Sequence, residues 1–169
     1  MAVRPIVTFP DQRLRTATER VTAFDGTLHA LATDLLDTMR AAPGIGITGP
    51  HIGVMQQIVV LDLPNSPEPE TYINPEIVWR SDETIRHEEG SISMPGISEQ
   101  IERSAKVHVR YQDLSGTEQM VEADGLRAIC LQHEIDQLNG IFWLQRLSAL
   151  RRTRLIARFE KLKRSGLSS

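Results

Sequence analysis

The sequence predicts an α+β fold, and three observations support that class. Apolar residues recur at steps of three and four near the start of the chain and again near its end, which is the helical period. Between these regions lie short runs of alternating or β-branched residues, which are typical of strands. These runs do not alternate regularly with helices, so we expect antiparallel sheets rather than a parallel sheet built from strand–helix–strand units.

Length and composition are typical of one globular domain. At 169 residues the chain can bury most of the surface that its unfolded form exposes, so we expect residues 1–169 to form a single domain. The formal charge of −3 gives no global basic field for nucleic acid. The single cysteine, Cys130, rules out an intramolecular disulfide. No apolar run after Met1 is long enough for a signal peptide or a membrane span. We expect a soluble, cytoplasmic protein with no DNA or membrane partner; the sequence does not determine its oligomeric state.

The first regular element should be a helix. Pro5 and Pro10 limit regular structure in residues 1–26. A helix should then begin at Asp25 or Thr27, either of which could cap it, and should end before the Pro-Gly pair at 43–44. Its apolar stripe, which should pack on the core, consists of Leu28, Leu31, Ala32, Leu35, Leu36 and Met39.

A glycine-rich loop follows at residues 44–51. It does not open a helix, as a phosphate-binding loop would, because Pro50 and Gly53 follow and residues 57–63 have a strand pattern. We therefore expect no nucleotide site here. Further strands are predicted at 72–73, 76–79, 84–88, 106–112 and 119–122, with a hairpin turn at 113–116. Two helices should finish the chain, one over 124–138 and one from Ser148 to about residue 163.

The helix over 124–138 carries the pair His133-Glu134. In the zinc-hydrolase motif H-E-x-x-H, two histidines on one helical face bind the metal and the glutamate moves protons for a metal-bound water. The residue four positions after His133 is Gln137, so the second histidine is missing. The pattern alone leaves open a chance match, a working variant or a site that has lost its metal.

Three stretches together resemble the peptide deformylase family, whose members remove the formyl group from the N-terminal methionine of new chains. GIGITGPH at 44–51 resembles the family's G-φ-G-φ-A-A-x-Q, EGSISMP at 89–95 resembles E-G-C-L-S-φ-P, and QHEIDQL at 132–138 resembles Q-H-E-x-D-H-L. The resemblance covers nearly the whole chain. It implies antiparallel sheets packed around a central helix that carries His133 and Glu134, followed by a C-terminal helix.

The departures from the family pattern affect the metal site. The family holds Fe(II) or a substitute divalent ion with one cysteine and two histidines, and the matching positions here are Ser91, His133 and Gln137. A cysteine with a free pKa of roughly 8.5 binds as thiolate, whereas a serine hydroxyl does not ionise comparably near neutral pH. An amide oxygen suits Mg²⁺ or Ca²⁺ better than Fe or Zn. We therefore expect no stable transition-metal binding and no cofactor, and treat the three positions as vestigial ligands.

The resemblance also implies roles for other residues. Glu134 retains the position of the general acid/base, the backbone N–H of Ile92 would face the substrate carbonyl, and His51 replaces the family's oxyanion-stabilising glutamine. Arg103 would form an ion pair with one of the two carboxylates next to the ligand positions, Glu89 or Asp136. The pocket for the methionine side chain should be lined by Gly44, Ile45, Gly46, Ile129 and Cys130.

Three interpretations of function follow. The leading one is a peptide deformylase-like protein whose activity is absent or strongly impaired and whose pocket still accepts peptide N-termini. The second is a divergent active hydrolase, either a weak deformylase with an unusual metal or a metal-free enzyme that uses Ser91 and His133. The third is a binding module that contacts the ribosome through a basic C-terminal helix, which contains Arg151, Arg152, Arg154, Arg158, Lys161, Lys163 and Arg164.

Overall fold

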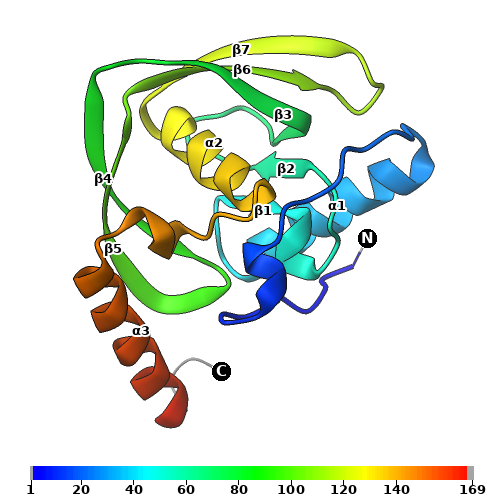
Figure 1. The fold of residues 1–169 in the computed structure, drawn as a ribbon. Helices are drawn as coiled ribbons and strands as arrows, with labels where there is room; N and C mark the ends of the chain where they lie inside the picture. The colour runs from blue at the N-terminus through cyan, green and yellow to red at the C-terminus, as the bar shows by residue number, and fades with distance from the viewer. Residues whose placement is uncertain (1, 167–169) are drawn as a thin grey trace.

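One helix lies at the centre of the molecule, between two antiparallel sheets. The computed structural model describes residues 2–166. In it, helix α2 (Gly125–Leu138) contacts strands of both sheets, as Figure 1 shows. The larger sheet has the strand order β1 (Gly46–Thr48), β2 (Ile58–Leu61), β3 (Glu70–Arg80), β6 (Lys106–Gln112) and β7 (Glu118–Asp124), and the smaller one pairs β4 (Thr84–Ser91) with β5 (Met94–Ser104).

The three predicted helices form where their capping residues indicated. Helix α1 (Gly26–Ala41) begins after Asp25, whose carboxylate accepts hydrogen bonds from the first-turn N–H groups of Thr27 and Leu28. Helix α3 (Ala149–Arg164) begins after Ser148, whose hydroxyl accepts from the N–H of Arg151. Helix α2 ends at Asn139, followed by Gly140 with a φ of 79°, which is the left-handed conformation that favours glycine.

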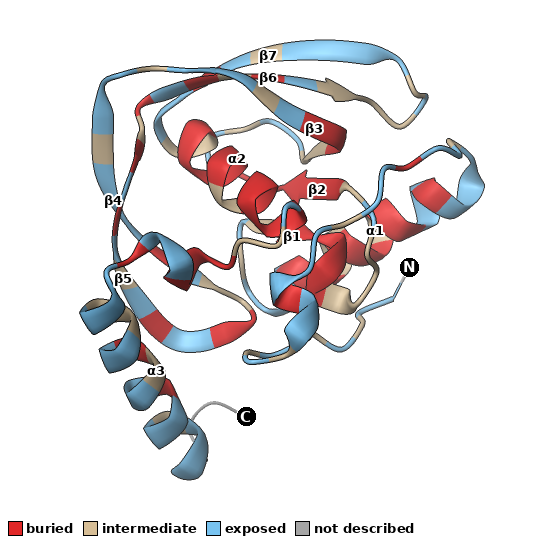
Figure 2. Ribbon diagram, viewed as in Figure 1, coloured by how far each residue is buried: buried red, intermediate tan, exposed pale blue. Residues whose placement is uncertain are grey.

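Burial distinguishes the central helix from the terminal one. Figure 2 shows that α2 is buried along almost its whole length, whereas most of α3 is exposed. One core cluster packs α2 against the larger sheet. A second cluster packs one face of α3 against β5 and the short helix η3 (Trp143–Arg146) through Phe159 and Leu155. Among the described residues, no helix is both long and apolar enough to cross a membrane.

Strands β1 and β5 were not predicted, and several predicted strands have different limits. The runs at 72–73 and 76–79 belong to the single strand β3, which continues through a bulge at Asn74-Pro75. Asn74 adopts a φ of 51° there, and its amide bonds both backbone groups of Val21. Strand β4 extends beyond residue 88 to Ser91, and β2 is shorter than the predicted run. The hairpin between β6 and β7 forms as predicted.

The N-terminal segment has little regular structure, apart from the short helix η1 (Gln12–Arg15). It runs across elements that are distant in sequence. The N–H of Val7 donates to the carbonyl of His51 at 2.8 Å, and the N–H of Phe9 donates to the carbonyl of Ser93 at 2.8 Å. The N–H of Thr18 donates to the carbonyl of Leu138 at the end of α2, at 2.9 Å.

Candidate functional site

A cavity of about 390 Å³ opens between α2, β1 and the end of β4. It is lined by all of the residues proposed from the sequence as site residues except Gln137, namely Gly44, Ile45, Gly46, His51, Ser91, Ile92, Ile129, His133 and Glu134. The fold therefore brings together residues from three separate stretches of sequence. Their individual roles remain predictions.

Helix α2 contributes the floor of the cavity. Leu126, Ile129, Cys130 and His133 lie at helical steps of three and four, so they share one face. Glu134 also lines the cavity, next to strand β1. A Cβ atom at Gly46 would overlap Glu134 Oε2, so a larger residue at this position would force the carboxylate to shift.

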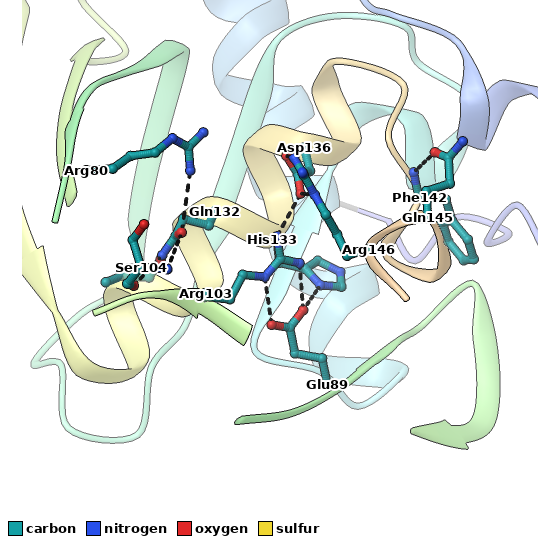
Figure 3. A network of polar contacts seen from close by, with 11 residues as sticks. Arg80, Glu89, Arg103, Ser104, Gln132, His133, Asp136, Phe142, Gln145 and Arg146 are labelled. Atoms are coloured by element: carbon teal, nitrogen blue, oxygen red, sulfur yellow. Dashed lines mark hydrogen bonds and ion pairs between the residues drawn. The ribbon is translucent and has the colours of Figure 1, made fainter. Parts of the chain in front are cut away.

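A buried ion-pair network holds the side chain of His133 in position through Glu89, as Figure 3 shows. The Nδ1 atom of His133 lies 2.8 Å from Glu89 Oε1. Arg103 donates two hydrogen bonds of 2.8 Å to the Glu89 carboxylate and one of 2.7 Å to Asp136. Arg146 donates two more to Asp136, at 2.9 and 2.7 Å. The predicted pairing of Arg103 with Glu89 or Asp136 is thus confirmed for both.

The network sets the charge states around the site. Burial penalises the Glu89 carboxylate, but its hydrogen bonds with Arg103 and His133 outweigh that penalty and lower its pKa to about 2. Burial likewise disfavours a charged His133, yet the Glu134 and Glu89 carboxylates raise its pKa. Burial raises the pKa of Glu134, which the positive charge of His133 only partly offsets. On the polar side of the cavity, the charge states of Glu89, His133 and Glu134 therefore depend on one another.

His51 is held in one tautomer. The backbone N–H of Thr48 donates to His51 Nδ1 at 2.9 Å, so Nδ1 is an acceptor. Burial, and then the neighbouring His133, lower the pKa of His51 to about 3, which keeps the ring neutral at neutral pH. The proton of a neutral imidazole must then be on Nε2. Nε2 has no hydrogen-bond partner among the described residues, and neither has Glu134 Oε1.

The replaced ligand positions are engaged in other contacts. Gln137 is 1% exposed, and its Nε2 donates to the carbonyl of Leu14 at 2.7 Å. Ser91 Oγ accepts from the N–H of Ser93 at 3.1 Å. Within residues 2–166, no hydrogen bond joins Ser91 to His133, although Glu89 supplies the orienting group for His133 that the sequence did not reveal.

These donors fit a transition metal poorly. Ser91 offers a neutral hydroxyl, and only the neutral amide oxygen of Gln137 remains once Nε2 is bonded to Leu14. His133 offers Nε2 alone, since Nδ1 contacts Glu89. In the part of the chain that the structure describes, no three His, Cys, Asp or Glu side chains are grouped so as to hold an ion.

Two further residues of the site were not recognised from the sequence. Thr48 fixes the tautomer of His51, and a threonine three residues before a histidine was the available signal. His87 is exposed and also lines the cavity. Its position two residues before Glu89 in a strand was the signal for it, because residues two apart share a face.

Comparison with known proteins places this fold and site in one family. A sequence model of the polypeptide deformylase family matches residues 3–153. A peptide deformylase-like protein of Brucella suis biovar 1 (strain 1330) is 64% identical over 164 residues, covering 97% of this chain and 100% of the relative. A peptide deformylase of the same strain is 42% identical over 165 residues, covering 96% of this chain and 94% of the relative. The crystal structure of a peptide deformylase from Legionella pneumophila superposes with a TM-score of 0.92 at 38% identity, covering 98% of each chain, which confirms the expected fold. The chain belongs to the polypeptide deformylase family.

Proposed function

We propose that this protein binds the N-terminal end of N-acylated peptides, formyl-methionyl peptides among them, without transition-metal-dependent hydrolysis. One observation carries the proposal. Two of the side chains that line the cavity each carry a buried polar atom with no hydrogen-bond partner among the described residues, His51 Nε2 and Glu134 Oε1, beside a donor set that fits a transition metal poorly. Buried polar atoms left without a partner are costly, so both call for complementary atoms in a ligand.

The two atoms are complementary to an acylated amine. The N–H of His51 Nε2 requires an acceptor, which the acyl carbonyl oxygen supplies. Glu134 Oε1 accepts a hydrogen bond from the amide N–H of the same acyl group. A free N-terminal ammonium could pair with Glu134 but has nothing to accept the proton of His51. The site should therefore favour an acylated over a free N-terminus.

Two strand edges make the cavity suitable for an extended peptide. Strand β1 lies at one edge of the larger sheet, and among the described residues β4 pairs only with β5. Both border the cavity, through Ile45 and Gly46 on one side and Glu88 to Ser91 on the other. Free strand edges present backbone N–H and C=O groups to which an added strand can bond. A peptide lying between them would place its first side chain over α2.

Absence of ordinary deformylase turnover follows from the donor chemistry. Glu134 keeps the general acid/base position, but the neutral donors of Ser91 and Gln137 do not support the ion that would acidify a water for it. The presence of both a peptide deformylase and a peptide deformylase-like protein in Brucella suis is consistent with separate roles for the two types. We place the binding activity in the cytoplasm, where N-formylated chains are made.

A metal-free hydrolase is the second candidate. The contact between Glu89 and His133 favours it, since it gives His133 the orienting carboxylate that a nucleophile–base pair needs. Ser91 Oγ would add to a carbonyl carbon as its proton passes to Nε2 of neutral His133, His133 would return that proton to the amine or alcohol as its bond to the carbonyl carbon breaks, and water would then hydrolyse the acyl-serine. The hydrogen bond from Ser93 N–H to Ser91 Oγ, in place of one between Ser91 and His133, argues against it. Esterase or amidase activity that survives Ser91→Ala would eliminate this candidate.

Binding and metal content should be measured on the same anaerobically handled protein. Calorimetric titration with formyl-Met-Ala-Ser and with Met-Ala-Ser should show tighter binding of the formylated peptide, with no release of formate. His51→Gln retains an N–H donor and should retain the preference, whereas His51→Leu should lose it. Stoichiometric iron or zinc with turnover, or equal affinity for the two peptides, would overturn the proposal.

A restored ligand set tests the donor argument separately. The double variant Ser91→Cys with Gln137→His supplies a thiolate and a second imidazole at the matched positions. We expect it to bind close to one transition-metal ion per chain, by elemental analysis, where the unmodified protein binds little. Equal metal content in the two proteins would show that the native donors are sufficient.

A further inference from the structure

His87 lies on the face of β4 that is turned toward the central helix. Glu89, two residues further on, is buried on that face and contacts His133. Residues two apart in a strand point to the same side and lie ~7 Å apart. The cross-strand neighbour of His87 is Ile101, which is 2% exposed, in agreement with an inward face. His87 itself is exposed and lines the cavity.

The wall that α2 contributes to the cavity is apolar on the N-terminal side of His133. Toward the N-terminus of α2 from His133, the cavity is lined first by Ile129 and Cys130 and then by Leu126. The seven residue steps of helix from 126 to 133 span ~10 Å. A peptide whose acyl group lies between His51 and Glu134 would extend its first side chain along this stripe. That side chain would meet three apolar groups and one imidazole.

The charges around the cavity select among side chains that could use the imidazole. Glu88, Glu89 and Glu134 line the cavity, and none of the lining residues is lysine or arginine. Arg103 and His133 offset the charge of Glu89, but Glu88 has no ion pair among the described residues, so an acidic side chain would meet an uncompensated carboxylate there. A neutral hydrogen-bond acceptor at the end of the side chain avoids that repulsion and still bonds to the imidazole N–H.

We infer that His87 is a specificity-determining residue, and that the bound peptide begins with a residue of methionine's length whose side chain ends in a neutral hydrogen-bond acceptor. The amide of glutamine and the oxide of methionine sulfoxide both have this chemistry. This inference rests on the proposed binding of acylated N-termini and adds the identity of the first residue. The hydrogen bond to His87 separates these side chains from methionine and norleucine, which fill the same apolar stripe without an acceptor of comparable strength.

Titration with four matched peptides tests the inference. Formyl-X-Ala-Ser is prepared with X as glutamine, methionine sulfoxide, methionine or norleucine, and the affinities are measured by calorimetry at pH 7.5. We expect one or both acceptor-bearing peptides to bind about fivefold more tightly than the norleucine peptide, the size of one net hydrogen bond. In His87→Leu this preference should vanish or reverse. In the control His29→Leu, which changes an exposed histidine on α1 outside the cavity, it should persist.

The outcomes distinguish a failure of this inference from a failure of the proposed function. A preference for glutamine alone or for the sulfoxide alone identifies which acceptor is used. Equal affinity for all four formylated peptides, or a preference that His87→Leu leaves intact, overturns the role of His87 while acylated-peptide binding stands. No difference between formylated and free peptides overturns the proposed function and this inference with it.

Discussion

Replacing Arg103 by methionine would test whether the buried network holds the site together. Arg103 and both of its partners have side chains no more than 6% exposed. The substitution keeps a similar apolar stem but removes the three hydrogen bonds to Glu89 and Asp136. Asp136 keeps its two bonds from Arg146, whereas Glu89 keeps only His133. Breaking a buried pair typically costs about 3–5 kcal/mol, and because Asp136 remains paired we expect the lower end, about 3 kcal/mol.

Urea denaturation would measure this loss against two matched variants. Arg110→Met removes exposed pairs with Glu76 and Glu118 and should cost less than about 1 kcal/mol. Arg103→Lys keeps the charge but not the two-pronged contact with Glu89, so its stability should fall between those of the native protein and Arg103→Met. A loss below about 1 kcal/mol for Arg103→Met would refute the assignment of the network as a structural anchor for His133.

Three other predictions concern pH, the replaced ligand and the terminal helix. The pKa of Glu89 is lowered from 4.5 to about 2 in the folded state. Its contribution to the free energy of unfolding, about 3 kcal/mol, should therefore be complete above pH 4.5 and lost as the pH falls toward 2. Urea midpoints measured across this range should depend less on pH in Glu89→Gln than in the native protein. Gln137→Leu leaves the buried carbonyl of Leu14 without its donor and should cost about 1–3 kcal/mol in urea denaturation, and an unchanged midpoint would contradict a structural role for this amide. Any contact of α3 with the ribosome should be lost in co-sedimentation after charge reversal of its exposed basic residues, and unchanged binding would exclude this face, which contains Arg154, Arg158 and Lys161.

The helices could be predicted from the sequence because their signals are local. Asp25 and Ser148 cap the helices that follow them, and Asn139-Gly140 ends α2. Each of these residues acts on backbone groups within a few positions, so a short window of sequence contains the full signal.

Strand β5 could not be predicted because its burial does not follow residue type. Its inward face includes the charged Arg103, which is buried only because Glu89 and Asp136 lie opposite. The bulge where β4 pairs with β5, at Gly90 and Ser91, also interrupts the regular pairing. Strand β3 was divided in the prediction by Asn74-Pro75, whose bulge is stabilised by a distant partner, Val21.

The residues that form the site could be predicted from the motif resemblance, but the contacts between them could not. The position of His51 was recognised, yet its tautomer depends on a backbone N–H whose direction only the fold sets. Gln137 was recognised as a replaced ligand, whereas its bond to Leu14 joins residues 123 positions apart. Such contacts have no signature in a window of sequence.

The hydrogen bonds of the N-terminal segment constrain the order in which the protein can fold during synthesis. Leu14 and Thr18 are synthesised first, yet they bond Gln137 and Leu138, which emerge from the ribosome more than a hundred residues later. The N–H groups of Val7 and Phe9 likewise await the carbonyls of His51 and Ser93, which are synthesised later. Contacts of such long sequence separation form slowly. The cavity can therefore be completed only after α2 has left the exit tunnel, so a partly synthesised chain lacks the side of the site that His133 and Glu134 form.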